Sequence, residues 1–450
     1  MRWIICAIAA FIWVSPIAAV AQEQAGSAFE EAATAHIMAL EQAAMRPLDE
    51  LIEEFETQRF SASYMAETTA GERRALLSSI RDAAAAAGGV GVDQDDQGFL
   101  MSLEGASVYQ IRISIAEAAP HRIDGLAIEE LAAPAALSLD TLEADIDALM
   151  TGENRSGLVY VRVDGEVVMQ KAYGMAIAEL GIPVGTETIF GIGSRPIDFT
   201  MAAIYLLESQ ERLSRDDTLG DHFPDVPQDR AGMTLRQMMT GQSGLPDFPA
   251  NESDWDADLG WIDRAEFERR TMAIPLLFAP GEGDAHSHWA FGLLAAIVER
   301  VSGTSYYEFL RENFFDRAGM ERTGNYGEIR DLEMADFAAG RGIQRGLPNI
   351  PPNWGPTSWL VMGSGGMYST LGDLERFYTH VTREGVIGDV GRAYFLGERA
   401  QLDGSDRGFE LFSFDDEERS DAVYVFLNSG GGPGATRPFV RPFINLLREN

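Results

Sequence analysis

The sequence predicts an α/β fold in which a mixed sheet is flanked by helices and follows a small α+β domain. The chain has 450 residues, a length that favours two or three domains. Its first third changes once from runs with helical spacing to short β-type runs, which favours a separate small domain. The remainder begins and ends with paired helix and strand patterns, and such pairing favours a sheet covered by helices.

The predicted N-terminal domain covers residues 22–136. Between 29 and 87 the chain is rich in Ala, Glu, Leu and Met at helical spacing, and breaks at Pro47 and at 68–71 divide this part into two or three helices. Short β-type runs separated by turn signals follow at 99–103, 108–115 and 123–128. A helical layer packed on a small meander is the simplest arrangement of these elements.

The predicted second domain covers residues 137–450. Its expected elements are, in order, a helix at 140–150, a hairpin with strands at 157–163 and 167–173, a buried strand at 422–427 and a closing helix at 439–447. An Asp-Gly pair joins the two hairpin strands, as is typical of a tight β-turn. The helices between the hairpin and the last strand would cover the sheet.

The N-terminus has the pattern of a secretory signal. Arg2 precedes an apolar run over 3–20, and Ala19 and Ala21 form an Ala-x-Ala cleavage site. We expect cleavage after Ala21, so that residues 1–21 are removed and the protein is exported, either periplasmic or secreted. The alternative is an uncleaved membrane anchor, which Pro16 and the cleavage site disfavour; a membrane is expected only in that case.

The composition excludes several classes of function. Asp and Glu number 70 against 35 Lys and Arg, and the net charge of −35 would repel a nucleic acid or an anionic membrane surface. Cys6, in the signal, is the only cysteine, so the body of the protein has no disulfide, no cysteine-ligated metal and no catalytic cysteine. Lys171 is the only lysine, so any chemistry that needs an amine side chain must use it.

Eight segments between residues 138 and 448 carry sequence patterns that occur together, in the same order, in known proteins. They lie at 158–174, 183–194, 213–227, 234–245, 278–281, 292–303, 318–320 and 363–370. Together they resemble the beta-lactamase-related serine hydrolases, which include class C beta-lactamases, DD-peptidases and carboxylesterases. The resemblance implies a beta-lactamase/transpeptidase-like fold for the second domain and an ancestry in acyl transfer. The N-terminal third lies outside it.

The first motif of this family is Ser-x-x-Lys, which places a nucleophilic serine and an activating lysine on one face of a buried helix. Here the motif reads Ser194-Arg195-Pro196-Ile197, so the resemblance implies Ser194 as the nucleophile but supplies no lysine. An isoleucine has no proton chemistry, and Arg195 stays protonated and points to another side of the helix. Lys171 lies on an upstream strand and is not expected to reach Ser194.

Two further family motifs are changed as well. The Tyr-x-Asn motif corresponds to His286-Ser287-His288, and the His-x-Gly or Lys-x-Gly motif corresponds to Leu402-Asp403-Gly404. Only the glycine, whose strand supplies a backbone N–H to the oxyanion in the family, is kept. Joint loss of the polar partners is expected of a relaxed network, because removing one member of a buried polar cluster costs more than removing all of them.

These observations leave three hypotheses for the function. The first is a member of the family that has lost most or all catalysis and binds a small molecule, peptide, glycan or protein in the old cleft, where His288, Asp403 and Gly404 would lie. The second is an active esterase or amidase that uses Ser194 as nucleophile and His286 as base, as imidazole does in other serine hydrolases.

The third hypothesis is a metal site built from His286, His288 and a carboxylate such as Asp284, because imidazole suits zinc, copper and nickel. In the second hypothesis a carboxylate, Asp284 or Asp403, would orient the imidazole of His286. Of the three we favour the first, and we predict neither a cofactor nor a metal. Whether the protein is an enzyme stays open at this point.

Overall fold

The computed structural model divides the chain into two compact units, with the boundary between Pro134 and Ala135. The residues that it describes are 29, 32–95, 98–105, 107–131, 136–247, 260–340, 348–405, 407–429 and 435–449. The predicted secretory signal at residues 1–21 lies outside the described residues. Its cleavage and the export of the protein therefore stay predictions.

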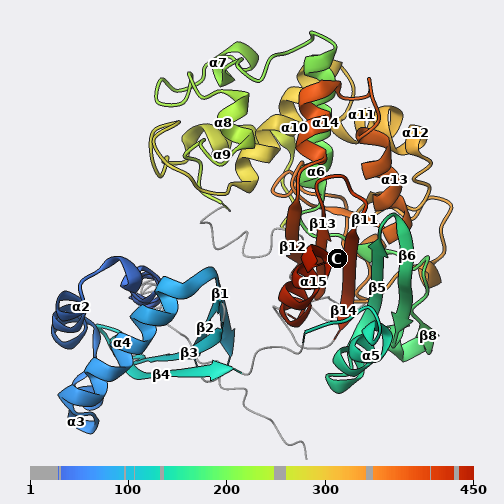
Figure 1. The fold of residues 1–450 in the computed structure, drawn as a ribbon. Helices are drawn as coiled ribbons and strands as arrows, with labels where there is room; N and C mark the ends of the chain where they lie inside the picture. The colour runs from blue at the N-terminus through green and yellow to red at the C-terminus, as the bar shows by residue number, and fades with distance from the viewer. Residues whose placement is uncertain are drawn as a thin grey trace, which may run out of the picture. The chain divides into compact units, whose positions relative to one another are not determined.

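The first unit consists of helices followed by a four-stranded antiparallel sheet (Figure 1). Its elements are a helix over 32–41, η1 (Gln42–Met45), α2 (Leu48–Glu54), η2 (Phe55–Arg59), α3 (Ala62–Glu67), α4 (Ala70–Ala86), β1 (Ala87–Asp95), β2 (Gly98–Gly105), β3 (Val108–Ile115) and β4 (Ile123–Leu131). The strands pair in sequence order as a meander. Apolar side chains from the helices and from the strands form one shared core.

A five-stranded sheet forms the centre of the second unit. In spatial order its strands are β12 (Arg399–Ser405), β13 (Phe409–Asp415), β14 (Ala422–Ser429), β5 (Ser156–Val163) and β6 (Glu166–Tyr173). Every neighbouring pair is antiparallel, so the prediction of a mixed sheet is wrong. The reason is that a C-terminal meander joins the predicted hairpin, and its last strand, β14, runs against β5 and not along it.

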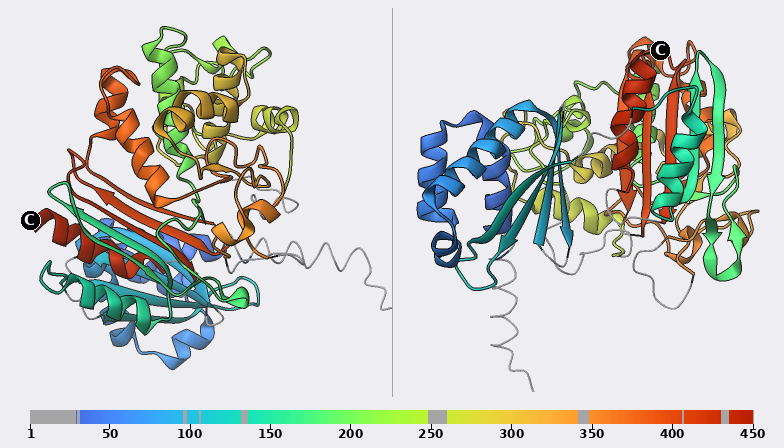
Figure 2. Two further views of the ribbon diagram at one scale, coloured as in Figure 1. Left: turned by 90° about the vertical axis from the view of Figure 1, so that its right-hand side faces the viewer. Right: turned by 60° about the horizontal axis from the view of Figure 1, so that its bottom comes forward.

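Both faces of this sheet are buried. Along β14, Val423 and Val425 point into one core and Tyr424 points into the other, as alternation along a strand requires. The helices α5 (Leu142–Gly152) and α15 (Arg437–Glu449) cover the first face (Figure 2). A central strand with two buried faces has few polar side chains, which explains why the sequence pattern of this segment is a continuous apolar run.

A group of helices covers the opposite face of the sheet (Figure 2). The helix α6 (Pro196–Ser209) is buried along most of its length. The other helices are α7 (Leu219–His222), α8 (Leu235–Met239), α9 (Arg264–Ala273), α10 (His288–Ser302), α11 (Tyr306–Leu310), η5 (Arg311–Phe315), α12 (Asp316–Ala318), α13 (Leu371–Val381) and α14 (Gly388–Phe395). Across the described ranges, none of the helices combines the length and the apolar content that crossing a membrane requires.

Close contact between β5 and β14 leads to a first prediction about stability. A Cβ atom on Gly157 would lie 1.8 Å from the carbonyl oxygen of Phe426, so only glycine fits this point of the sheet. Gly157→Ala should lower the free energy of unfolding by at least about 1–3 kcal/mol, the usual cost of overpacking a core. Urea denaturation of the two proteins measures this difference.

The matched control is Gly152→Ala at the end of α5, where an added Cβ would meet nothing within 4 Å. This change should leave the stability unchanged or raise it by up to about 1 kcal/mol, because alanine restricts the unfolded chain. Equal effects of the two substitutions would show that the close approach of the strands is not a constraint.

Candidate active site

Ser194 lies in a turn directly before α6, on the side of the sheet where the helices gather. Gly193 precedes it with φ of +53°, and Pro196, at the first position of the helix, has the φ that a helix start requires. A Cβ atom on Gly193 would lie 2.7 Å from both the backbone nitrogen and the backbone oxygen of Gly404. Glycine is therefore needed here for two reasons, the positive φ and the lack of space for a side chain. The serine hydroxyl is therefore held at the positive end of a long buried helix, where negative charge is stabilised.

The side chain that reaches Ser194 belongs to His288. Its Nε2 lies 3.4 Å from the Oγ of Ser194. His288 is the first residue of α10, and Ser287 caps that helix by accepting a hydrogen bond from the backbone N–H of Ala290 at 3.2 Å. The distance between the two side chains is long for a hydrogen bond, as is common in a site before substrate binds.

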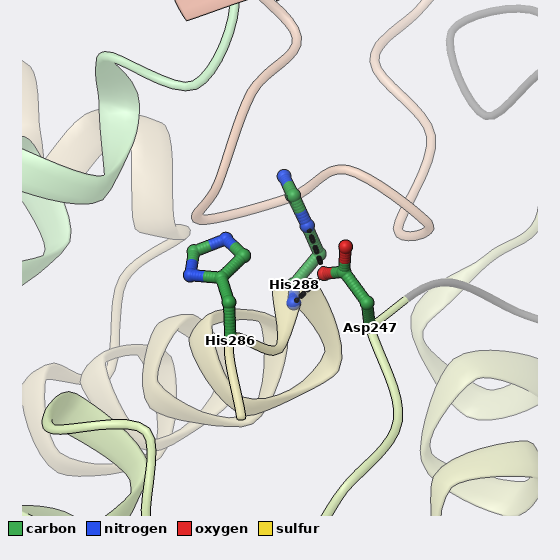
Figure 3. A group of neighbouring side chains, drawn as sticks. All are labelled: Asp247, His286 and His288. Atoms are coloured by element: carbon green, nitrogen blue, oxygen red, sulfur yellow. Dashed lines mark hydrogen bonds and ion pairs between the residues drawn. The ribbon is translucent and has the colours of Figure 1, made fainter. Parts of the chain in front are cut away.

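Asp247 lies on the other side of the same imidazole (Figure 3). Its Oδ1 is 2.6 Å from the Nδ1 of His288 and also accepts the backbone N–H of His288 at 3.2 Å. The side chain of His288 is 11% exposed and that of Asp247 is 50% exposed. Burial alone would raise the pKa of Asp247, but its hydrogen bonds to His288 outweigh this effect and the pKa is lowered.

The three side chains form a chain of contacts from carboxylate to imidazole to hydroxyl. Because the ionised carboxylate of Asp247 can only accept a hydrogen bond, the Nδ1 of His288 must donate it and therefore carries the ring proton. The lone pair of Nε2 then faces Ser194. This is the tautomer that a general base needs in order to take a proton from a serine hydroxyl. The geometry of a Ser-His-Asp triad is thus present with His288 at its centre.

His286, which the sequence hypothesis made the base, has a different position. Its ring packs edge-on against that of His288, with centroids 4.8 Å apart, and also lies near Phe291. Burial and the neighbouring His288 lower its pKa. In the structure the imidazole next to Ser194 is therefore that of His288 and not that of His286. The capped start of α10 directs the second imidazole of the motif at the hydroxyl.

Asp247 was not recognised in the sequence. It follows the Ser243-Gly244-Leu245 turn that belongs to the family pattern, and that position close to a known landmark is the signal that could have drawn attention to it. Asp284, proposed as a partner of the histidines, instead lies beside Gly241, with its carboxylate oxygens 3.2 and 3.3 Å from the position of an added Cβ.

Hydrogen bonds between two loops hold Asp247 and His288 together. The hydroxyl of Ser287 donates to the carbonyl of Pro246 at 2.8 Å, so the residue before His288 is tied to the residue before Asp247. Three backbone hydrogen bonds join the same loops: Leu277 to Gly244 at 2.7 Å, Gly281 to Gln242 at 2.9 Å and Ala285 to Gly241 at 2.8 Å. Such a scaffold places the carboxylate and the imidazole before any ligand arrives.

Arg195, directly after Ser194, carries a buried positive charge. Its side chain is fully buried and forms an ion pair of 2.6 Å with Asp403, which is 7% exposed, on β12. It also donates to the hydroxyls of Tyr378 and Ser413 and to Gln401. Burial alone would lower the pKa of Arg195, but the nearby Asp403 carboxylate outweighs this effect, and the pKa of Arg195 is raised. Burial raises the pKa of Asp403 to about 6.

A second carboxylate completes this buried polar cluster. Asp198, one helical turn after Ser194, accepts hydrogen bonds from Tyr378 at 2.6 Å, from Arg399 at 2.6 Å and from Gln401 at 3.2 Å. The expectation of a relaxed network is therefore wrong, because a buried ionic cluster lies at the start of α6. Asp403 belongs to this cluster through Arg195, and the idea that it orients His286 is wrong as well.

The remaining candidates also have clear positions. Lys171 forms ion pairs with Asp147 at 2.7 Å and with Glu143 at 2.8 Å, on α5, so the only amine of the chain is engaged away from Ser194. Ile197 packs against the core that surrounds α6. Gly404 lies against the turn of Ser194, as the family resemblance implies for the strand beside the nucleophile.

A buried helix that carries a serine at its start, packed against an antiparallel sheet, is the arrangement of the beta-lactamase type of serine hydrolase. The comparisons with known proteins agree with this class. A family model described as Beta-lactamase matches residues 142–411, more than half of the chain. The chain therefore belongs to the beta-lactamase family, with the first unit as an additional N-terminal region.

Two curated relatives are distant in sequence. Penicillin-binding protein 4* of Bacillus subtilis (strain 168) is 26% identical over 298 residues, which cover 64% of this chain and 65% of that protein. The D-alanyl-D-alanine-carboxypeptidase/endopeptidase AmpH of Escherichia coli (strain K12) is 26% identical over 242 residues, which cover 53% of this chain and 60% of that protein. The chain thus spans less than two thirds of the length of these relatives.

Solved structures show the same fold. The octameric penicillin-binding protein homologue from Pyrococcus abyssi superposes with a TM-score of 0.56 at 22% identity, over 69% of this chain and 78% of that one. A class C beta-lactamase superposes with a TM-score of 0.56 at 16% identity, over 69% of this chain and 97% of that one. At these identities the likeness concerns the fold alone.

The buried ion pair leads to a prediction about stability. Arg195→Met leaves the carboxylate of Asp403 buried without its partner, which should lower the free energy of unfolding by about 3–5 kcal/mol. The double variant Arg195→Met with Asp403→Leu should recover part of this loss, because it also removes the unpaired charge. Chemical denaturation measures both; a double variant no more stable than the single one would contradict the assigned pair.

Proposed function

We propose that the protein is an active serine hydrolase in which Ser194 is the nucleophile, His288 the general base and Asp247 the residue that orients it. The observation that carries the proposal is the continuous contact from the Asp247 carboxylate through the imidazole to the Ser194 hydroxyl. In the lysine-dependent members of the family an amine beside the serine takes the proton. Here the imidazole of His288, at the start of α10, would perform that step.

The reaction follows from the positions of these groups. His288 accepts the proton of the Ser194 hydroxyl at Nε2 as the oxygen attacks a carbonyl carbon, and returns it to the leaving group of the ester or amide. In this proposal, the N-terminus of α6 and the backbone of β12 beside Gly404, which lies against the turn of Ser194, would stabilise the negative charge on the carbonyl oxygen. Water then releases the acyl group from Ser194 by the same proton transfers in reverse order.

The substrate class that we propose is a carboxylic ester or an amide, taken by an exported protein. The family membership supports acyl transfer, and the carboxypeptidase/endopeptidase AmpH among the relatives makes a peptide one candidate substrate. An ordinary beta-lactamase is the least favoured enzyme, because the motif residues on which acylation and deacylation depend in that class are replaced by His286, His288 and Leu402.

The second candidate is the non-catalytic binding protein that the sequence favours. The replacement of the family lysine by Ile197 supports it, as does the engagement of Lys171 by two carboxylates. The two candidates differ in a single property, the reactivity of Ser194, and can be separated by one experiment.

That experiment is labelling with a fluorophosphonate together with hydrolysis of a simple aryl ester. Wild-type protein should be labelled, and Ser194→Ala and His288→Ala should each lose about 10³-fold or more of the rate, because members of a triad act as a unit. Asp247→Asn should cause a smaller loss, since this half-exposed carboxylate can be replaced partly by water.

His286→Ala is the matched comparison, because it removes a neighbouring imidazole that does not contact the hydroxyl. Its effect on hydrolysis should be far smaller than that of His288→Ala, and the reverse order would restore the original assignment of His286 as the base. Wild-type protein that neither hydrolyses the ester nor reacts with the fluorophosphonate would support the binding protein instead.

A further inference from the structure

The side chains of Asp247, His286 and His288 form a compact group with the composition of a metal site (Figure 3). Their potential ligand atoms all lie within 4.8 Å of one another. In the part of the chain that the structure describes, no other group of three or more His, Cys, Asp or Glu side chains comes together in this way. Two members of the group belong to the proposed triad, and His286 does not.

We propose that these three side chains bind a zinc-type divalent cation and that the bound cation switches the hydrolase off. Two imidazoles and one carboxylate are ligands that suit zinc, copper and nickel. Three protein ligands with a remaining position for water are typical of zinc sites that exchange their ligands. The switching half of the proposal rests on the proposed function, whereas the binding half stands without it.

The geometry requires only small movements. With bonds of about 2.0–2.2 Å, a tetrahedral zinc ion holds its ligand atoms roughly 3.3–3.6 Å apart. The contact between Asp247 and the Nδ1 of His288 is 2.6 Å and would open by less than about 1 Å, a movement that the half-exposed carboxylate can make. His286 is an exposed residue whose ring already meets that of His288 edge-on, so it can complete the site by rotation.

The effect on the triad follows from the proton count of the imidazole. A neutral ring carries one proton, which in the triad is on Nδ1, facing Asp247. When a cation binds at Nδ1, that proton must move to Nε2, and Nε2 then has no lone pair to accept the proton of Ser194. Asp247 is withdrawn at the same time, because its oxygen binds the cation and no longer orients the ring.

Two features of the molecule favour this use of the site. The hydrogen bonds that tie Ser287 to Pro246 and Ala285 to Gly241 hold the two loops together, so a cation would not have to order them. The net charge of −35 raises the concentration of cations near the protein surface.

The test measures binding and inhibition separately in the full chain after dialysis against a chelator. Isothermal titration with Zn²⁺ should show one ion bound per wild-type chain, and Co²⁺ should give the visible absorption of a tetrahedral nitrogen and oxygen site. His286→Gln should weaken Zn²⁺ binding by at least about tenfold, the loss that even a supporting residue of a metal site causes. Ser194→Ala should bind Zn²⁺ as the wild type does, because the serine is not a ligand.

The matched control is His222→Gln. The Nε2 of His222 lies 3.4 Å from a carboxylate oxygen of Asp217, so it is a histidine paired with an aspartate that lacks a second imidazole in the same group. This variant should bind Zn²⁺ like the wild type. Loss of binding in His222→Gln, or undiminished binding in His286→Gln, would overturn the site.

Inhibition is measured for each protein as the ratio of the rates of ester hydrolysis with and without Zn²⁺. The wild type should lose at least about tenfold of its rate at saturating Zn²⁺ and regain it with chelator, while His286→Gln should lose far less at the same concentration. Hydrolysis that is unchanged or increased by bound Zn²⁺ would overturn the switch. Stoichiometric Zn²⁺ binding by a chain that hydrolyses no ester without metal would disprove the proposed function and leave the metal site standing.

Discussion

The buried charge of Arg195 is the constraint on which the rest of the site depends. A guanidinium cannot lose its proton, so its burial at the start of α6 requires a carboxylate within reach, and Asp403 on β12 provides it. This pair fixes the start of the helix against the edge strand. The turn that carries Ser194, one residue earlier, lies against Gly404 through Gly193, although the lysine of the family motif is absent.

Once the helix and the strand are joined in this way, the base can come from elsewhere. The polar cluster is held together without an amine on α6, because Asp198 accepts hydrogen bonds from both Tyr378 and Arg399. The first residue of α10, His288, places an imidazole 3.4 Å from the serine hydroxyl. Under the proposed function, the structural and chemical roles that one lysine combines in the family would be divided between Arg195 and His288.

Much of the fold could be predicted from the sequence, because periodicity and landmark order are local properties. The helices around 140–150 and 439–447, the first hairpin and the buried strand at 422–427 are all present, and the family resemblance is confirmed. The prediction of a mixed sheet was wrong, since the direction in which β14 runs beside β5 depends on a pairing across more than 250 residues. Nothing in a local pattern records that direction.

The site was harder to predict for the same physical reason. Position in a motif indicated both His286 and His288, but the residue that reaches Ser194 depends on where α10 begins, and the Ser287 cap determines this point. Asp247 is brought to the imidazole by hydrogen bonds between two loops about forty residues apart. The charge pattern along the sequence does not show such a contact. For the same reason it does not indicate Asp403 as the partner of Arg195. Counting lost motif residues therefore does not decide whether the chemistry is lost, because a proton acceptor is defined by its distance from the hydroxyl and not by its place in an inherited motif.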